Sequence, residues 1–339
     1  MSQAETQNRT AEPRALSRRL NHYRQPRRSR SIMEIAVTAV PFALIWILMW
    51  ATLGLSYWLT LLLSVPAAGF LVRLFMIQHD CSHMSFFHSR KANHWVGRVI
   101  GVFTLTPHDL WRYTHIQHHA NSGNLDRPSI GGLETLTVRE FHALTFFQRL
   151  RYRLYRHPIV LFGFGPAYIF LLSYRLPFGF MRNGWMPWMS TMGTNLGIAA
   201  LVAILIGSVG LGPFLLIQLP ITLVASTIGV WLFYVQHQFE TTYWEHDDQW
   251  TSQEAALHGS SHYVLPGVLR WFSANIGVHH VHHLCSRIPC YRLPEVLRDF
   301  PELQEVSRIT LWQSIESVRL ALWDENKRRL VSFREANAC

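Results

Sequence analysis

The residues with the clearest chemical potential in this sequence are histidines gathered in short clusters. The clusters are HDCSH at 79–83, HIQHH at 115–119 and HHVHH at 279–283, and His237 begins a further motif, HQFE. Side chains three and four positions apart lie on one face of a helix, so each cluster can direct two or three imidazole rings toward one point. Rings bunched in this way predict a metal centre. The candidate ligands are His79, His83, His115, His118, His119, His237, His279, His282 and His283.

The number of candidate ligands narrows the kind of metal centre. Imidazole suits zinc, copper, iron and nickel, but one zinc ion takes only three or four protein ligands. Two metal ions sharing the histidines, with open positions left over, fit a dinuclear iron centre that activates oxygen. Soluble di-iron proteins use bridging carboxylates, and the neighbouring Asp80 and Glu240 do not match that pattern. We expect both carboxylates to orient the rings, and Asn275, one helical turn before His279, either to do the same or to cap a helix.

Other histidines are expected to stay outside the centre. His280 lies inside the third cluster, but consecutive side chains of a helix diverge, so its ring should point away from the other three. His258 and His262 are four apart in HGSSHY and are interpreted as polar packing residues. His88 is expected at the membrane interface.

The composition predicts an integral membrane protein. Of the 339 residues, 49% are hydrophobic and only 15% are charged, and the apolar residues are segregated along the chain. Four segments, 34–53, 56–77, 192–210 and 213–235, are each long enough to cross a hydrocarbon layer of about 30 Å. Tryptophan and tyrosine cluster near the segment ends, as in the aromatic belts of membrane proteins. The predicted fold is therefore an all-α membrane protein.

A single metal site constrains the topology, because every histidine cluster must emerge on the same side of the membrane. The number of crossings between clusters is then even. A third hydrophobic block at 159–174 is short and contains Gly163, Gly165 and Pro166. We interpret it as re-entrant or interfacial, and the run at 95–107 as interfacial, which leaves four spans. Six spans, with another crossing hidden in 176–191, is the alternative.

The chain divides into three parts. Residues 1–32 are expected to form a basic, disordered arm, since the first 30 residues contain eight arginines and two glutamates. Residues 33–300 would form the membrane domain, and 301–339 a helical segment that caps the site. The positive-inside rule places the arm, and with it the histidine clusters, in the cytoplasm. The formal charge of +10 could attract anionic lipid or an acidic electron donor, and no nucleic-acid partner is expected.

Four separated motifs together resemble the membrane fatty acid desaturases, in particular bacterial acyl-lipid desaturases related to the plant oleate and linoleate enzymes. The motifs are HDCSH, HIQHH followed by ANSGNLDRP, YVQHQFE at 234–240 and NIGVHHVHHLCSRIPCYRLP at 275–294. Their order and spacing cover roughly residues 35–300. Ser82 stands where relatives often have glycine, which exchanges one small residue for another.

The resemblance implies a non-haem di-iron centre in a bacterial inner membrane, with its active site on the cytoplasmic face. O₂ and two electrons would remove two hydrogens from an unactivated acyl chain, which we expect to be lipid-linked, and leave a cis double bond. By the family's pattern the nine histidines would be the iron ligands. The sequence has no HPGG-like haem motif and no nucleotide or flavin fingerprint, so electrons must come from outside. The resemblance implies ferredoxin or flavodoxin.

Two other functions remain open at this point. A fatty acyl hydroxylase could use the same scaffold, since the same oxidant can add oxygen to the carbon instead of removing a second hydrogen. A membrane metal transporter or sensor would place polar ligands inside its spans, whereas these histidines lie at or beyond the span ends.

An acyl chain beneath two metal ions needs a dry tunnel, and two apolar stretches with small residues adjoin the clusters. They are Gly97 to Leu105 and Thr227 to Phe233. We predict that Gly101 and Gly229 leave room for the chain. The alternative is that these glycines only allow helices to approach closely, as small residues commonly do in membranes.

Overall fold

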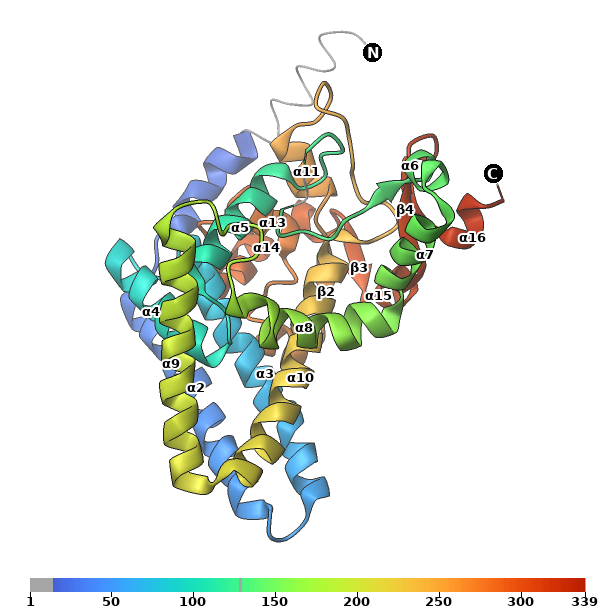
Figure 1. Ribbon diagram of the computed structural model, residues 1–339. Coiled ribbons are helices and arrows are strands. Elements are labelled where there is room, and N and C mark those ends of the chain that lie inside the picture. The colour runs from blue at the N-terminus through green and yellow to red at the C-terminus, as the bar shows by residue number, and fades with distance from the viewer. Residues whose placement is uncertain (1–14, 128–129, 339) are drawn as a thin grey trace.

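Four long helices form two hairpins that extend from one end of the molecule. The computed structural model describes residues 15–127 and 130–338. Helices α2 (Arg28–Thr52) and α3 (Tyr57–Ser82) form one hairpin, and α9 (Trp185–Val209) and α10 (Leu211–His237) form the other, with both hairpin tips at the bottom of Figure 1. Each is long and apolar enough to cross a membrane, with mean hydropathy between 1.9 and 2.2. The four predicted spans are confirmed.

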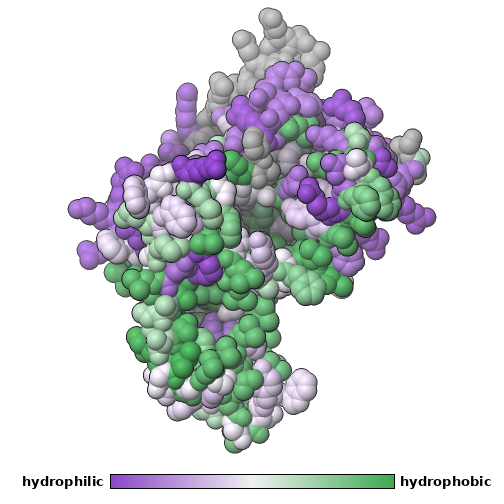
Figure 2. Space-filling model, in the orientation of Figure 1, coloured by the Kyte–Doolittle hydropathy of each residue, from purple (hydrophilic) through white to green (hydrophobic). Residues whose placement is uncertain are grey.

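The four helices differ in how far they are covered by protein. The most apolar stretch of α9 is only 6% buried, whereas that of α3 is 61% buried. Exposed apolar side chains on α9 are what a lipid-facing helix requires, because no water is present to penalise them. Figure 2 shows the same division over the whole molecule, with a hydrophobic lower part and a hydrophilic upper part. Helix α3 is therefore the central helix, and α2, α4 and α10 pack around it.

A buried ion pair joins the first two spans. The Arg73 guanidinium on α3 binds the Glu34 carboxylate on α2, and both side chains are at most 5% exposed. The guanidinium also donates to the backbone carbonyl of Trp271 and lies 4.0 Å from the centre of its indole ring. Two charged side chains within apolar helices are thus partners, which their separation in sequence does not indicate.

The hydrophobic block at 159–174 forms a bent element. Helix α7 (Phe146–Tyr155) leads into a π-helical segment, η2 (Val160–Phe164), and then into α8 (Gly165–Leu171). The axis bends by 56° at the break before Val160. This bend fits the predicted re-entrant or interfacial element, and the even number of crossings stays a prediction.

Helix α4 (Arg90–Phe103) has the character expected of an interfacial helix. Trp95, Val99 and Phe103 are four residues apart and exposed, so they form one apolar stripe. The opposite face, which includes Asn93 and Ile100, is buried against α3 and α5 (His108–Asn121).

Short elements complete a polar layer above the spans. The remaining helices of six or more residues are α6 (Val138–Ala143), α11 (Ser252–His258), α12 (Gly267–Phe272), α13 (His279–Leu284), α14 (Leu293–Asp299) and α15 (Leu311–Glu316). Shorter turns are η1 (Leu20–Arg24), η3 (Ser173–Arg175), η4 (Cys290–Arg292), η5 (Pro301–Gln304), η6 (Ser317–Arg319) and α16 (Phe333–Ala336). The strands are β1 (Leu136–Thr137), β2 (His262–Val264), β3 (Arg308–Thr310), β4 (Leu320–Asp324) and β5 (Arg329–Ser332).

The expectation of a helical segment at 301–339 is wrong for much of its length. Strands β4 and β5 form an antiparallel hairpin, β1 pairs with β4 in parallel, and β2 pairs with β3. Leu322 and Val331 are fully buried against Phe141 and Tyr152. The charged residues at 325–328 form the hairpin turn instead of a solvated helix face, because packing against the earlier helices decides the structure here.

The basic arm is ordered where the structure describes it. Leu20 is fully buried and Tyr23 is 7% exposed, and both pack among apolar side chains from 278–303. The Tyr23 hydroxyl donates to Asp299 over 2.7 Å. The prediction of disorder is therefore wrong for residues 15–32, while residues 1–14 lie outside the described part of the chain.

Candidate metal centre

The nine predicted ligands converge where the spans meet the polar layer. They form two groups, and within each group one possible ligand atom per residue lies within 4.8 Å of the others. One group is His79, His83, His115, His119 and His282. The other group is His118, His237, His279 and His283.

The nitrogen atoms within the groups have the spacing that a shared metal ion requires. Bonds of about 2.0–2.1 Å at tetrahedral or octahedral angles place neighbouring ligand nitrogens roughly 2.8–3.4 Å apart. In the first group the Nε2 atoms of His83 and His115 are 3.0 Å apart, and those of His119 and His282 are 3.2 Å apart. In the second group Nε2 of His237 lies 3.0 Å from that of His118 and 3.1 Å from that of His279.

Four elements supply these rings. Helix α3 carries His79 in its last turn and His83 at its C-cap, and α10 ends at His237. Helices α5 and α13 contribute three histidines each at i, i+3 and i+4, so one face of each helix serves both groups. The intervening His280 points away, as expected, and its Nε2 donates to the Leu303 carbonyl over 2.9 Å.

Neighbouring residues orient individual rings. The Gly259 carbonyl accepts a hydrogen bond from Nδ1 of His237 over 3.0 Å, which leaves Nε2 free for a metal. Trp111 stacks on His115 with a centroid distance of 4.5 Å and an interplanar angle of 15°. Sequence reasoning missed both. The spacing of four between Trp111 and His115 was a usable signal, whereas Gly259 acts through its backbone and leaves none.

The electrostatics of the site fit metal binding. Burial lowers the pKa of the imidazoles outside the spans well below the ordinary value for histidine, and neighbouring histidines lower it further. The rings are therefore neutral at physiological pH, which is the form that binds metals. Nε2 of His283 is buried without a hydrogen-bond partner among the described residues, although such atoms are costly to leave unsatisfied. Neutral nitrogen donors, closely spaced and partly unsatisfied, fit a pair of transition-metal ions.

The three predicted orienting residues behave differently. Asp80 is buried with one oxygen 3.5 Å from Nδ1 of His79, while the other accepts a hydrogen bond from the Cys290 backbone over 2.7 Å. Glu240 does not reach the site, because α10 ends at His237 and the following chain turns outward, where Glu240 binds Arg329 on β5.

Asn275 also has a role other than the predicted ones. It precedes the start of α13 by four residues and has a positive φ of 61°, so it lies in a turn outside the helix. Its side-chain amide donates to the Cys290 carbonyl over 3.2 Å. Asn275 thus holds the start of η4 in place through Cys290, and no hydrogen bond joins its side chain to a ligand ring among the described residues.

The other singled-out histidines lie outside the two groups. His258 is half exposed, with Nε2 3.7 Å from Glu254, and Nδ1 of His262 donates to the Gln304 carbonyl over 2.6 Å. His88 is exposed on the loop before α4. These placements agree with polar packing and surface roles.

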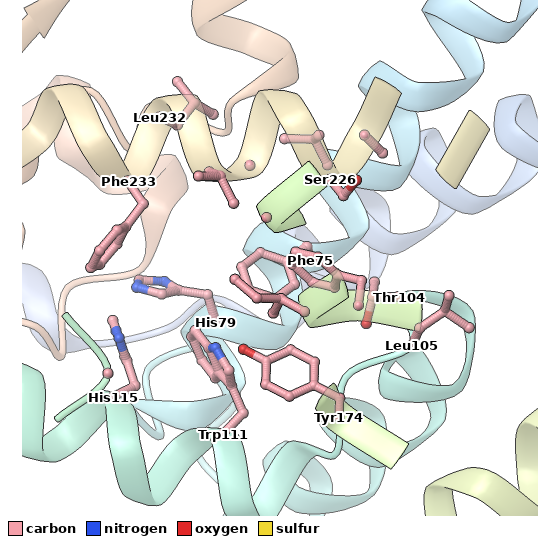
Figure 3. A pocket seen from close by; sticks show the side chains of 18 of the residues that line it. Phe75, His79, Thr104, Leu105, Trp111, His115, Tyr174, Ser226, Leu232 and Phe233 are labelled. Atoms are coloured by element: carbon pink, nitrogen blue, oxygen red, sulfur yellow. The ribbon is translucent and has the colours of Figure 1, made fainter. Parts of the chain in front are cut away.

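A cavity of about 440 Å³ opens directly beneath the histidines. His79, His115 and His279 line one end, and the wall is mainly apolar side chains from α3, α8 and α10. Figure 3 shows Phe75, Trp111 and Leu232 around this space, with His79 and His115 at its side. The metal site and the cavity are continuous.

The two glycines predicted to line a tunnel have different surroundings. Gly229 lines the cavity, and a Cβ atom there would meet nothing within 4 Å. At Gly101 a Cβ would lie 2.4 Å from the Thr106 carbonyl oxygen, so this glycine only permits close backbone contact. The tunnel assignment is wrong for Gly101, while Phe103, Thr104 and Leu105 of the same stretch do line the cavity.

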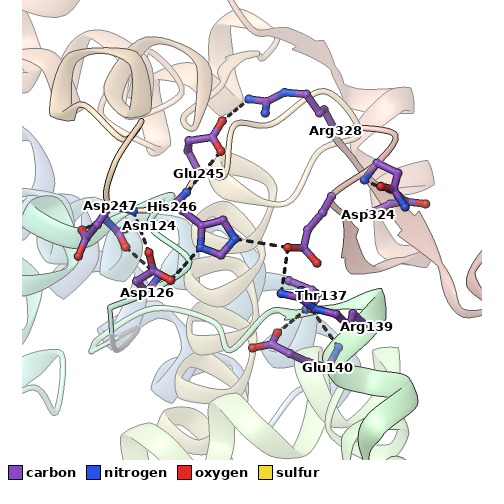
Figure 4. Close-up of polar contacts among 12 residues, drawn as sticks. Asn124, Asp126, Thr137, Arg139, Glu140, Glu245, His246, Asp247, Asp324 and Arg328 are labelled. Atoms are coloured by element: carbon purple, nitrogen blue, oxygen red, sulfur yellow. Dashed lines mark hydrogen bonds and ion pairs between the residues drawn. The ribbon is translucent and has the colours of Figure 1, made fainter.

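A polar network ties the loop after α5 to the segment after α10 and to the C-terminal hairpin (Figure 4). His246 contacts Asp126 over 2.8 Å through Nδ1 and Glu325 over 3.3 Å through Nε2. The side-chain amide of Asn124 donates to Asp247 over 2.8 Å, and Arg328 binds Glu245. These contacts lie outside the metal groups and hold the covering segments together.

Comparison with known proteins gives one consistent result. The fatty acid desaturase family profile matches residues 56–314. A fatty acid desaturase of Bacillus subtilis (strain 168) is 44% identical over 94% of this chain and 90% of its own length. An sn-1 acyl-lipid omega-3 desaturase (ferredoxin) of Synechocystis is 26% identical over 71% of this chain and 68% of its own length. An sn-1 oleoyl-lipid 12-desaturase of Picosynechococcus is 25% identical over 78% and 74%.

The matched region contains the second, third and fourth spans and every one of the nine clustered histidines. Its extent and the identity to the Bacillus relative exclude a chance match, and they favour an oxidoreductase over a metal transporter or sensor. The chain belongs to the fatty acid desaturase family, whose members introduce double bonds into fatty acyl chains.

Proposed function

We propose that the two histidine groups hold two iron ions and that this protein uses O₂ to desaturate an acyl chain of a membrane lipid, giving a cis double bond. The observation that carries the proposal is the continuity of the apolar cavity with His79, His115 and His279. A methylene pair in that cavity lies against the rings that would hold the metals.

The protein's own residues do three things in this proposal. The nine imidazoles supply neutral nitrogen ligands from four different elements, so they fix the ions in place at the cavity end. Bound iron would supply the oxidising power of O₂ that removing hydrogen from an unactivated carbon requires. The apolar wall, including Phe75 and Leu232, binds the chain and keeps water from the reacting carbons.

The shape of the cavity bears on where the double bond forms. Its lining runs from the histidines past Phe75 and Trp111 toward Thr104, Leu105 and Ser226. The open volume beside Gly229 would accommodate part of an acyl chain that enters this space. The length of the chain would decide how far it extends along the cavity. The path length along the cavity to the histidines would then select the carbons that react.

The substrate and the electron donor are the finer parts of the proposal. Relatives named acyl-lipid desaturases support a lipid-linked chain, and one of them is named for ferredoxin. A formal charge of +10 suits an acidic donor such as ferredoxin or flavodoxin. The arginine-rich N-terminal segment favours a cytoplasmic active site in a bacterial inner membrane.

The test is the fatty acid profile of a desaturase-free bacterial host expressing this chain, by gas chromatography with mass spectrometry and double-bond localisation. A new cis double bond in membrane lipids is expected, and none with the matched variant His282→Ala. A hydroxylated product would instead support the hydroxylase alternative.

Orientation is tested separately with reporter fusions after residues 30, 90, 125, 245 and 339. All five should report the cytoplasm. A periplasmic signal at 125 or 245 would place the histidine clusters on opposite sides of the membrane and refute a shared site.

A further inference from the structure

A third cluster of potential metal ligands lies away from the nine histidines, where α4 meets the start of α5. It consists of His94 on α4 and of His108 and Asp109 in the first turn of α5. One ligand atom from each residue lies within 4.8 Å of the other two, the same spacing that characterises the two groups of the metal centre. His108 precedes His115 by seven residues, about 10 Å along the helix, so the cluster is a separate site.

The environment of His108 is the feature that calls for a ligand. Its side chain is fully buried, and neither ring nitrogen has a hydrogen-bond partner among the described residues. Leaving a buried polar atom unsatisfied destabilises a fold. His280, which is also fully buried outside the centre, differs because its Nε2 donates to a carbonyl and only its Nδ1 lacks a partner among the described residues. Burial also lowers the pKa of His108 to about 4, so its ring stays neutral.

The other two residues present their atoms at a spacing suited to a metal ion. Nδ1 of His94 lies 3.2 Å from Oδ1 of Asp109, close to the roughly 3.3 Å expected between two ligands of a tetrahedral zinc ion. The side chains of His94 and Asp109 are 29% and 17% exposed, so an ion can reach them from solvent. The buried third ligand lies behind them.

The surroundings hold the cluster in position. Arg98, one turn after His94, donates to Oδ2 of Asp109 over 2.8 Å and leaves Oδ1 directed at His94. Gly97 lies against the His108 ring, and a Cβ there would come within 2.2 Å of it. The helices therefore approach closely enough at Gly97 to bring His108 beside His94. Metal ligands are commonly oriented by such outer hydrogen bonds.

We propose that His94, His108 and Asp109 form a third metal site, which binds one zinc-like divalent ion and leaves a position open for water. Two imidazoles, one carboxylate and a water make the four-coordinate set of zinc sites that keep one position open. The site would fasten α4 to α5 on either side of the turn that carries Thr104 and Leu105, two residues of the cavity wall. It would act as a structural clamp for that wall.

The test is metal analysis of purified, iron-loaded protein in detergent, incubated with zinc and desalted. Wild type is expected to retain one zinc per chain more than His94→Gln, His108→Gln or Asp109→Asn, while the iron content of all four stays equal. The matched control is His88→Gln, which replaces an exposed histidine on the loop just before α4 and should retain the additional zinc. Zinc should also raise the melting temperature of wild type and leave that of His94→Gln unchanged.

Two results would overturn the proposal. One is that iron-loaded wild type retains no zinc after desalting. The other is that zinc is retained equally by wild type and by the variants, which would place it elsewhere. If His108→Gln does not fold because its site is buried, the partly exposed His94 and Asp109 decide the question. A polar clamp without metal would give equal zinc contents and no zinc-dependent rise in melting temperature.

Discussion

The metal centre and the cavity beneath it share a boundary but depend on different properties of the chain. The centre depends on residue identity, since seven of the nine rings place a nitrogen atom 3.0–3.2 Å from that of a neighbouring ring. The cavity depends on missing volume, as at Gly229, where a side chain would meet open space. Substitutions should therefore affect chemistry in the first region and selectivity in the second.

The largest expected effect follows removal of a ring from the centre. His119→Ala or His282→Ala should lower product formation by more than about 100-fold, since even residues that only orient a ligand contribute 10–100-fold. His280→Ala, in the same helix as His282, should retain most activity because its ring binds the Leu303 carbonyl. Lipid analysis alongside immunoblots of membranes would measure both. An inactive His280 variant beside an active His279→Ala would contradict the assigned helix face.

The next largest effect concerns the buried ion pair between α2 and α3, the helix that carries His79 and lines the cavity. Arg73→Leu leaves the buried Glu34 carboxylate with the half-exposed Arg30, 2.8 Å away, as its remaining ion-pair partner, which should reduce stability by about 1.5–3 kcal/mol. The double variant Arg73→Leu, Glu34→Gln should recover part of this loss because no buried carboxylate remains, while Arg30 is half exposed. Unfolding of the purified proteins in detergent would compare them. Equal stability of the single variant and wild type would mean that the pair is not desolvated.

Selectivity for acyl-chain length and double-bond position should change when Gly229 is substituted and should not change when Gly101 is substituted. Gly229→Leu extends into the cavity and should shorten the accepted chain or move the double bond, with normal iron content. Gly101→Ala should instead lower stability by about 1–3 kcal/mol, because its Cβ overlaps the Thr106 carbonyl oxygen. Product profiles and melting temperatures of both variants separate the two effects. A shifted profile from Gly101→Ala with unchanged stability would reverse the assignment.

The smallest effect is expected in the covering segments, at His246. Hydrogen bonds to Asp126 and Glu325 raise the pKa of this histidine. A raised pKa in the folded state stabilises the fold at pH values below the ordinary histidine pKa, and this contribution is lost as pH rises through the raised value. His246→Gln should thus lower the melting temperature at about pH 6 more than at pH 8. The difference should be modest, since the side chain is 43% exposed, and its absence would mean that solvent screens the pair fully.

The contrast between local and distant determinants explains which features were predictable from sequence. The faces of α5 and α13 follow from spacings of three and four residues, and the spans follow from continuous apolar runs. The prediction for Glu240 failed because α10 ends three residues earlier, at His237, and the chain beyond a helix end can turn away from the site. The prediction that Gly101 lines the cavity failed because the space at a glycine depends on the segment packed against it, here Thr106. The β4–β5 hairpin and the pairing of Glu34 with Arg73 depend on partners far along the chain.

The metal content of the purified protein tests the central claim most directly, because the two histidine groups are proposed to hold one iron each. We expect about two irons per chain, no haem absorbance and a loss of iron in His282→Ala but not in His280→Ala. Zinc at the third cluster would add to the zinc count without changing the iron. Stoichiometric zinc in the nine-histidine site, as the only metal that supports turnover, would contradict the account.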